Sequence, residues 1–130
     1  MLFRSSVTIT ATCTVANGTL AFGSQAASAL SANIDATGTF TVNCTNNANY
    51  AITMDNGVNA SGVQRRMNDG GTGYLNYNLY SDAGRTTSWG SVSGTATGAN
   101  QTISVYGRIP SGQTATAGSY SDTVQFTVTY

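Results

Sequence analysis

The sequence predicts an all-β protein built as a sandwich of two antiparallel sheets. Three observations support this prediction: short runs in which apolar and polar residues alternate, turn-forming dipeptides between these runs, and a composition in which Thr, Ser, Gly and Asn supply 62 of the 130 residues. Alternation with a period of two is typical of strands with one buried face, and this composition favours strands and turns over helices. The length suits one two-layer core, so we expect a single domain.

The first strand is expected near the N-terminus. Val7, Ile9, Ala11 and Cys13 alternate with threonines, so an extended backbone would place the apolar side chains on one face and the hydroxyls on the other. Asn17-Gly18 follows this run and predicts a turn.

Four further runs repeat the alternation in the middle of the chain. They are Phe40, Val42 and Cys44; Tyr50, Ile52 and Met54; Leu75, Tyr77 and Leu79; and Ile103, Val105 and Gly107. The segments between the runs contain sequences typical of turns, namely Asn56-Gly57, Asp69-Gly70-Gly71 and Ala83-Gly84. The only proline, Pro110, is expected to end the strand at Ile109, because proline lacks the amide that a strand interior needs.

The last run is the most regular and reaches the C-terminus. Val124, Phe126, Val128 and Tyr130 alternate with threonine and glutamine, which predicts an amphipathic strand. About seven strands with almost no helical periodicity predict an immunoglobulin-like two-sheet antiparallel sandwich in preference to a closed barrel.

The two cysteines, Cys13 and Cys44, are expected to form a disulfide. Neither belongs to a CxxC pair, and the chain has no histidine with which they could share a metal. The alternative is two buried free thiols. A disulfide would place the protein in the periplasm or outside the cell, where such bonds persist.

Charge and hydropathy exclude several classes of partner. The five Lys and Arg residues balance the five Asp and Glu residues, and no basic run is present, so the chain lacks the electrostatic pattern that holds nucleic acid or anionic lipid. No apolar stretch reaches the eighteen or so residues that a membrane span requires. A signal peptide is not visible in the first residues, from which we expect that an export signal was removed or that the native start differs.

The composition also argues against an enzyme or a cofactor-binding protein. Without histidine, the usual nucleophile and base pairs are unavailable. Asp55, Asp69, Asp82 and Asp122 fall near turns or strand edges, where aspartate commonly bonds to its own backbone. Asp69 stands alone in its loop, which argues against calcium. We therefore expect no catalytic, cofactor-binding or metal-binding residues.

Two other groups of residues have a structural and a functional interpretation. Tyr74, Tyr77, Tyr80 and Trp89 could form an aromatic platform for glycans, but the alternation around Tyr77 favours core packing, and Trp89 is interpreted as the buried tryptophan common in sandwiches. The charge doublet Arg65-Arg66 is expected to lie in a solvated loop.

Several segments resemble the spore coat protein U family, which includes the pilin subunits of archaic, Csu-type chaperone-usher pili. The likeness runs from about Val7 to Tyr130. It rests on Cys13-Thr14-Val15, Leu20-Ala21-Phe22-Gly23, Phe40-Thr41-Val42-Asn43-Cys44, Leu79-Tyr80-Ser81-Asp82, Trp89-Gly90, Gly107-Arg108-Ile109-Pro110, Gln113 and Ala117-Gly118-Ser119-Tyr120-Ser121-Asp122-Thr123-Val124.

The resemblance implies a sandwich that lacks its last strand and is completed by donor-strand complementation from a neighbouring subunit. It also implies a homopolymer of identical or related subunits, a periplasmic chaperone that holds each subunit, an outer-membrane usher that assembles them, and delivery through the periplasm to the cell surface. The expected function is a structural pilus or fimbria subunit that supports adhesion and biofilm formation. The alternatives are a monomeric carbohydrate-binding module or tip adhesin, and a spore or cyst coat protein.

The residues suggest which segments would form the joint. Residues 1–12 are expected to be the donor segment and residues 13–130 the domain. The donor side chains on one face would be Phe3, Ser5, Val7, Ile9 and Ala11, and the acceptor edge strand would carry Val124, Phe126, Val128 and Tyr130. The competing interpretation is that residues 7–14 form the first strand of their own domain. Both interpretations stay open, because alternation alone does not say which sheet a strand joins.

Overall fold

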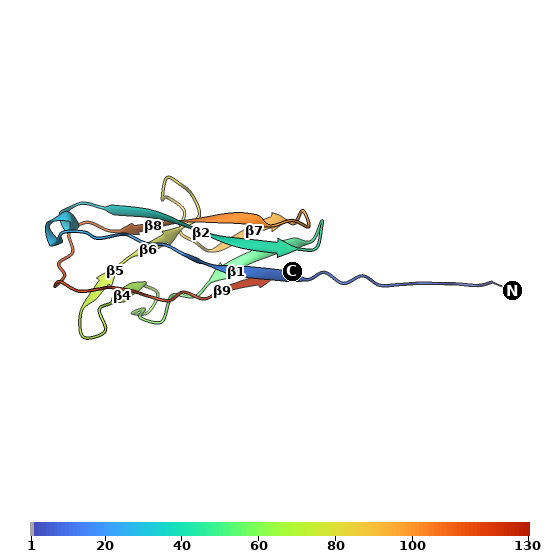
Figure 1. Ribbon diagram of the computed structural model, residues 1–130, viewed down its shortest axis with the longest axis horizontal. Coiled ribbons are helices and arrows are strands. Elements are labelled where there is room, and N and C mark those ends of the chain that lie inside the picture. Colours follow the sequence, from blue (N-terminus) through green and yellow to red (C-terminus); the bar gives the residue numbers. More distant parts are fainter. Residues whose placement is uncertain (1) are drawn as a thin grey trace.

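The computed structural model describes residues 2–130 and shows an elongated two-sheet sandwich with a segment that projects from one end (Figure 1). One sheet has the strand order β1-β2-β8-β6, formed by Cys13–Thr19, Ile34–Cys44, Gln101–Ile109 and Asn78–Tyr80. The second sheet has the order β7-β3-β9, formed by Ser91–Thr95, Asn49–Met54 and Phe126–Thr129. Arg66–Asn68 and Tyr74–Asn76 make a small hairpin, β4-β5, and Ala27–Ser31 forms a 3-10 turn. The predicted all-β antiparallel sandwich is confirmed.

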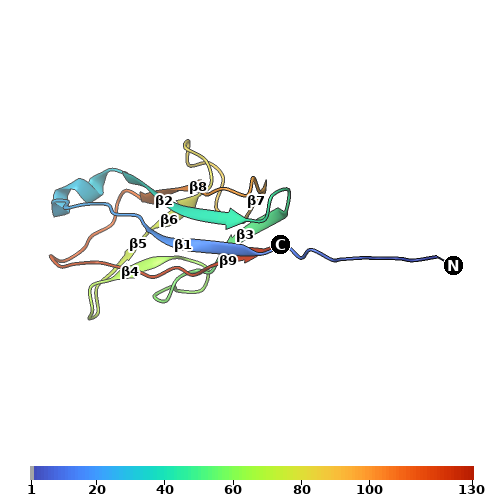
Figure 2. The same cartoon turned by 45° about the vertical axis from the view of Figure 1, so that its right-hand side comes forward.

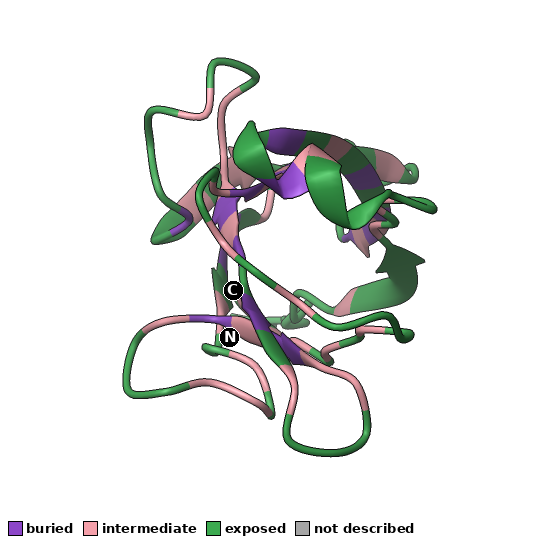
Figure 3. Cartoon of the chain, turned by 90° about the vertical axis from the view of Figure 1, so that its left-hand side faces the viewer, coloured by how far each residue is buried: buried purple, intermediate pink, exposed green. Residues whose placement is uncertain are grey.

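The core lies between the two sheets and follows the predicted alternation. Strand β2 buries Phe40, Val42 and Cys44, and β3 buries Tyr50 and Ile52. In Figure 3, which views the molecule from the end opposite the N-terminal segment, buried residues lie along the strands while the loops are exposed. The apolar faces of the strands therefore meet each other, as the period of two requires.

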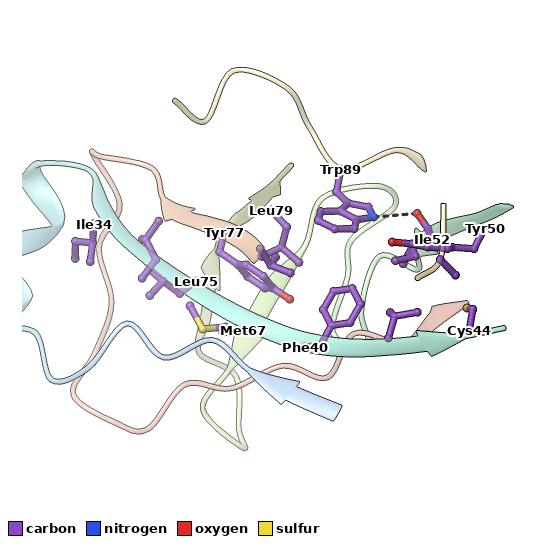
Figure 4. Packing of buried hydrophobic residues seen from close by; sticks show 14 of the residues in the cluster. Ile34, Phe40, Cys44, Tyr50, Ile52, Met67, Leu75, Tyr77, Leu79 and Trp89 are labelled. Carbon is purple, nitrogen blue, oxygen red and sulfur yellow. Dashed lines mark hydrogen bonds between the residues drawn. The ribbon is translucent and has the colours of Figure 1, made fainter. Parts of the chain in front are cut away.

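Aromatic rings join the two sheets at the centre of this core. Phe40 of β2 stacks on Phe126 of β9 with 4.3 Å between ring centroids, and it also packs against Trp89 at 6.2 Å. The Trp89 indole nitrogen donates a hydrogen bond of 3.3 Å to the Ile52 carbonyl oxygen (Figure 4). Trp89 is 6% exposed, which confirms its prediction as a core residue.

Two local predictions are wrong. Asn17-Gly18 is not a turn but lies inside β1, where the pairing with β2 shifts between Ala16 and Thr19 as in a β-bulge. Glycine is needed there because a Cβ at position 18 would collide with the Thr39 carbonyl group of β2. The bulge explains why a turn-like dipeptide occurs within a strand.

The run Leu75, Tyr77 and Leu79 is buried as predicted, but it is not one strand. It is divided at Tyr77, because β5 pairs with β4 while β6 pairs with β8 in the four-stranded sheet. The Tyr77 backbone amide instead donates to the Arg65 carbonyl oxygen at 3.1 Å. One alternating run therefore contributes a strand first to the small hairpin and then to the four-stranded sheet.

Candidate functional site

The N-terminal segment is extended and solvent-exposed along its described length. Residues 2–12 belong to no strand, and each of them is exposed. Phe3 is 96% exposed, Val7 82% and Ile9 79%, values far from those of a strand packed on a core. Figures 1 and 2 show the segment leaving the sandwich at the end where the C-terminus also lies. Met1, the first residue of the expected donor segment, lies outside the described residues.

Pairing with the rest of the chain begins where this segment ends. The Thr45 amide donates to the Thr12 carbonyl oxygen at 2.9 Å, and the Thr12 amide donates to the Thr45 Oγ1 atom at 3.0 Å. The next residue, Cys13, pairs with Cys44 in β2 and forms the predicted disulfide with it. The competing interpretation, in which residues 7–14 form the first strand of their own domain, differs from the structure, because within this chain the first strand begins at Cys13.

The C-terminal segment forms a free edge of the second sheet. Strand β9 pairs with β3 on one side, and the bonding continues upstream: the Asp55 amide donates to the Gln125 carbonyl oxygen at 2.9 Å, and the Val58 amide to that of Thr123 at 3.1 Å. Ser121 exchanges two backbone bonds with Asn68. These bonds use the odd-numbered residues of the segment, so the backbone groups of its even-numbered residues point to the opposite side, which no strand among residues 2–130 pairs with.

A groove of about 1570 Å³ lies between the N-terminal and C-terminal parts of the domain. One wall is formed by β1 and the segment that follows it, with Val15, Leu20 and Phe22, and the other by residues 115–126. The lining between them is mainly apolar, although Thr39 and Asp55 also belong to it, and it includes Leu30, Ile34, Phe40, Met54, Met67, Leu75, Tyr77, Leu79, Val105 and Ile109. Several of these core residues appear in Figure 4. Small-molecule pockets usually measure about 300 to 1,000 Å³, so this groove is large enough for a chain segment.

The groove lies where the two sheets fail to close. β1 is an edge strand of the four-stranded sheet and β9 is an edge strand of the three-stranded sheet. An unpaired edge exposes backbone amides and carbonyl groups that can hydrogen-bond to another strand. The groove thus combines an apolar floor with unpaired backbone at its sides, the two features that strand addition requires.

The side chains of the C-terminal wall alternate as the sequence indicates. Val124, Phe126 and Val128 are half-buried and packed against the core, whereas Tyr130 is 59% exposed. Of these four residues of the expected acceptor edge, Val124 and Phe126 line the groove. Sequence reasoning did not assign Leu20 and Phe22 to the groove, although their spacing of two residues is the signal that could have done so.

A polar group interrupts the apolar lining at Asp122. The Tyr77 hydroxyl donates to its Oδ2 atom at 2.6 Å, while the Asn59 amide and the Asn59 side-chain nitrogen both donate to Oδ1 at 3.1 Å. Burial, and then the hydrogen bond to Asp122, raise the pKa of Tyr77 far above its usual value, so this phenol remains a hydrogen-bond donor. Neither the sequence pattern nor the resemblance indicated this cluster.

The doublet Arg65-Arg66 is part of the same region and corrects another prediction. Arg65 is only 9% exposed, and its Nη2 atom donates to the Asp55 carbonyl oxygen at 2.8 Å. Arg66 lies in β4, with its Nε atom bonded to the Asn59 carbonyl oxygen and its guanidinium group 3.8 Å from the centre of the Tyr74 ring. The doublet is not a solvated loop, because both guanidinium groups bond to backbone carbonyls beside the groove.

The aromatic platform considered for glycans does not form from the residues named for it. Trp89 and Tyr77 are buried in the core, whereas Tyr74 is 43% exposed and lies against Arg66. Tyr80 is half-buried in β6. These four rings are distributed between the core and the surface, so they do not present one face to a sugar.

Among the five aspartates, Asp55, Asp69 and Asp82 bond to nearby backbone, Asp35 pairs with arginine, and Asp122 bonds to Tyr77 and Asn59. Asp82 accepts hydrogen bonds from the Thr86 hydroxyl and the Thr87 amide, which lower the pKa of its carboxyl group. Asp35 accepts two bonds from Arg108, at 2.7 and 3.1 Å. Among residues 2–130, no group of three potential metal-binding side chains is found. In the same residues, no helix is long and apolar enough to cross a bilayer.

Comparisons with known proteins agree with this fold. The Spore Coat Protein U domain family matches residues 1–127. Protein U of Myxococcus xanthus is 36% identical to the chain over 129 residues, covering 87% of this chain and 72% of that protein.

A solved structure has a similar fold at lower sequence identity. It is the CsuC-CsuE chaperone-tip adhesion subunit pre-assembly complex from archaic chaperone-usher Csu pili of Acinetobacter baumannii, one chain of which matches with a TM-score of 0.63 and 21% identity. The match covers 95% of this chain but spans only 40% of the length of the solved chain, so it concerns the fold. The match over residues 1–127 and the likeness to Protein U lead to one conclusion: this chain belongs to the Spore Coat Protein U domain family.

Proposed function

We propose that the protein is a structural subunit of a bacterial surface pilus or fimbria, assembled by the chaperone-usher route through donor-strand exchange. Residues 1–12 would be the donor segment and residues 13–130 the domain that accepts a donor from a neighbour. The observation that carries the proposal is the combination of an open apolar groove with an exposed segment whose apolar side chains alternate. The segment of one molecule would supply the strand that is absent from the groove of the next molecule.

The segment is poorly placed to fill the groove of its own molecule. It leaves the domain at Cys13 and points away from the sandwich (Figure 1). To enter its own groove it would have to reverse direction before Cys13, and residues 2–12 contain no Gly, Asn or Asp. Tight hairpin turns need positive φ angles and favour Gly, Asn or Asp, whereas a β-branched residue rarely adopts such angles. Donation to a second molecule avoids that reversal.

The expected gain on insertion is sufficient for a long-lived joint. Phe3, Val7 and Ile9 are almost fully exposed in the free segment, and burial of each side chain would contribute about 1.5 to 3 kcal/mol. Backbone hydrogen bonds to the unpaired edges would add to this gain, while ordering the segment opposes it.

The proposal includes partners and a location. A free groove exposes apolar surface, so a periplasmic chaperone would hold each subunit until an outer-membrane usher adds it to the fibre. The Cys13–Cys44 disulfide supports passage through an oxidising compartment to the cell surface. Adhesion to host or abiotic surfaces and biofilm formation would be properties of the assembled fibre. A coat layer on a spore or cyst remains the second candidate, favoured by the similarity to Protein U, and it would use the same joint.

A gel comparison with two matched variants tests the proposal. The oxidised protein is run on a denaturing gel without heating and after boiling, and the expected result is a ladder of multimers that collapses to monomer on boiling. Ile9→Asp should abolish the ladder, because it places a charge on the inserted face of the segment, and a free peptide of residues 2–12 should bind the resulting monomer. Thr10→Asp adds the same charge on the other face and should keep the ladder. Monomer in every lane of the unmodified protein would refute the proposal.

A further inference from the structure

The exposed segment has one polar position on its apolar face. Phe3, Val7 and Ile9 point to the same side as Ser5, because successive side chains of an extended strand alternate. The groove has a matching feature on its C-terminal wall. Tyr120, Val124 and Phe126 line it with apolar surface, and Asp122 lies between them on the same side.

Asp122 has room for one more hydrogen bond. An ionised carboxylate offers about four acceptor sites, and three donors already occupy it, two from Asn59 on Oδ1 and the Tyr77 hydroxyl on Oδ2. Asp122 is half-buried and lines the open groove, so water is in contact with part of this residue. A strand inserted into the groove would remove that water, so an apolar side chain placed there would leave the site unsatisfied.

The direction of an inserted segment follows from the shape of the molecule. The segment leaves one end of the sandwich (Figure 1), so a neighbour stacked end to end receives it at its opposite end. Residues 115–118 lie toward that receiving end, and the chain runs from there through residues 119–125 to β9 and the C-terminus (Figure 2). An inserted segment would therefore run antiparallel to the C-terminal wall, with its later residues near position 115 and its earlier residues near Phe126.

We propose that Asp122, held by Tyr77 and Asn59, bonds to Ser5 of the incoming segment and thereby sets the register of strand exchange. This inference rests on the proposed function and specifies the joint. With Ser5 opposite Asp122, Phe3 lies opposite Val124, and Thr12, the first residue anchored in the donating domain, reaches Ala115, where the groove lining of the wall begins.

Other registers lose this match. A shift of one residue turns the apolar face of the segment out of the groove. A shift of two residues places either Phe3 over Asp122, with the Ser5 hydroxyl against Tyr120, or Val7 over Asp122, with the Ser5 hydroxyl against Val124. Since one hydrogen bond to a buried charged group is at stake, the matched register should be favoured by about tenfold or more.

Disulfide crosslinking between pairs of introduced cysteines measures the register directly. The Ser6 side chain lies on the outer face of the segment, and in the proposed register it stands opposite Ser121, whose backbone bonds point away toward Asn68. Such non-hydrogen-bonded pairs have Cα atoms about 4.5 Å apart, which suits a disulfide. We expect Ser6→Cys with Ser121→Cys to give multimers that resist boiling but collapse in reductant, about tenfold more than Ser6→Cys with Ser119→Cys or Thr123→Cys. Ser6→Cys alone is the control for mispairing with the native disulfide.

Exchange of two donor residues tests whether the hydrogen bond between Asp122 and Ser5 sets the register. Ser5→Val combined with Val7→Ser moves the hydroxyl by two positions without altering the folded domain, and it should move the preferred partner of Ser6→Cys from Ser121→Cys to Thr123→Cys. Thr8→Val, on the outer face, should leave the preference unchanged. If crosslinking stays at Ser121→Cys after the exchange, if the original segment prefers another partner, or if a ladder forms without any crosslink, the register proposal is overturned while strand exchange stands. If no pair crosslinks and no boiling-sensitive ladder forms, the proposed function itself fails.

Discussion

Removal of the Cys13–Cys44 disulfide should destabilise the domain substantially, because this bond closes a large loop at the edge of a sheet. The two cysteines are 31 residues apart in the sequence. On the chain-entropy model, a loop of that size stabilises the folded state by about 3 to 4 kcal/mol. The bond also attaches the start of β1, which forms one wall of the groove, to β2.

Urea unfolding measures this loss in monomeric protein. Ile9→Asp monomers saturated with the peptide of residues 2–12 would be compared in the oxidised state, in the reduced state and as the Cys13→Ala/Cys44→Ala variant, with the fluorescence of the single tryptophan, Trp89, as the signal. With an m-value of about 1.5 to 2 kcal/mol/M, the midpoint should fall by about 2 M urea on reduction.

The comparison between the reduced protein and the alanine variant separates two causes. Reduction removes only the covalent link, whereas alanine also removes sulfur atoms, one of which belongs to the almost fully buried Cys44. The alanine variant should therefore be the least stable, with a further loss of about 1 kcal/mol from the cavity. A midpoint that moves by less than about 0.5 M on reduction would refute the argument that loop closure stabilises this domain.

Two further predictions concern the core and the acid range. Trp89→Ala should cost about 3 to 5 kcal/mol in free energy of unfolding, followed by circular dichroism, because it empties a site packed against Phe40; the exposed Tyr74→Ala should cost less than about 1 kcal/mol, and equal losses would contradict the assignment of Trp89 to the core. The hydrogen bond from Arg108 lowers the pKa of Asp35 below its ordinary 3.8, so the pair stabilises the fold above that value and the contribution is lost as pH falls through the lowered pKa. Asp35→Asn should therefore reduce stability slightly at pH 7 and flatten its dependence on pH below about 4, whereas an unchanged acid profile would exclude this linkage.

Local sequence was a good guide wherever one face of a strand meets the core. Phe40, Val42 and Cys44 alternate in the sequence and are buried together in β2, and Trp89 and the disulfide are placed as predicted. The reason is geometric: side chains of an extended chain alternate between two faces, so a period of two states which residues share a face.

The sequence did not predict the structure at positions whose burial or pairing depends on a segment distant in the sequence. Gly18 lies within a strand because the Thr39 backbone of β2 approaches it closely. Arg65 is buried because the Asp55 carbonyl oxygen accepts its guanidinium group. The Asp122 cluster brings Tyr77, 45 residues away in the sequence, against the groove wall. None of these contacts leaves a periodic signal, since each depends on how separate strands pack.

The N-terminal segment shows most clearly what the sequence determines and what only the tertiary structure decides. Its alternation of Phe3, Val7 and Ile9 is the same whether the strand pairs with its own domain or with a neighbour, so the sequence alone determined that it can be a strand but not where it pairs. The tertiary structure decided that pairing within this chain starts at Cys13 and that a groove remains open between β1 and the C-terminal wall. The physical reason is that strand pairing is a property of two edges, and only the folded arrangement shows which edges are still unpaired.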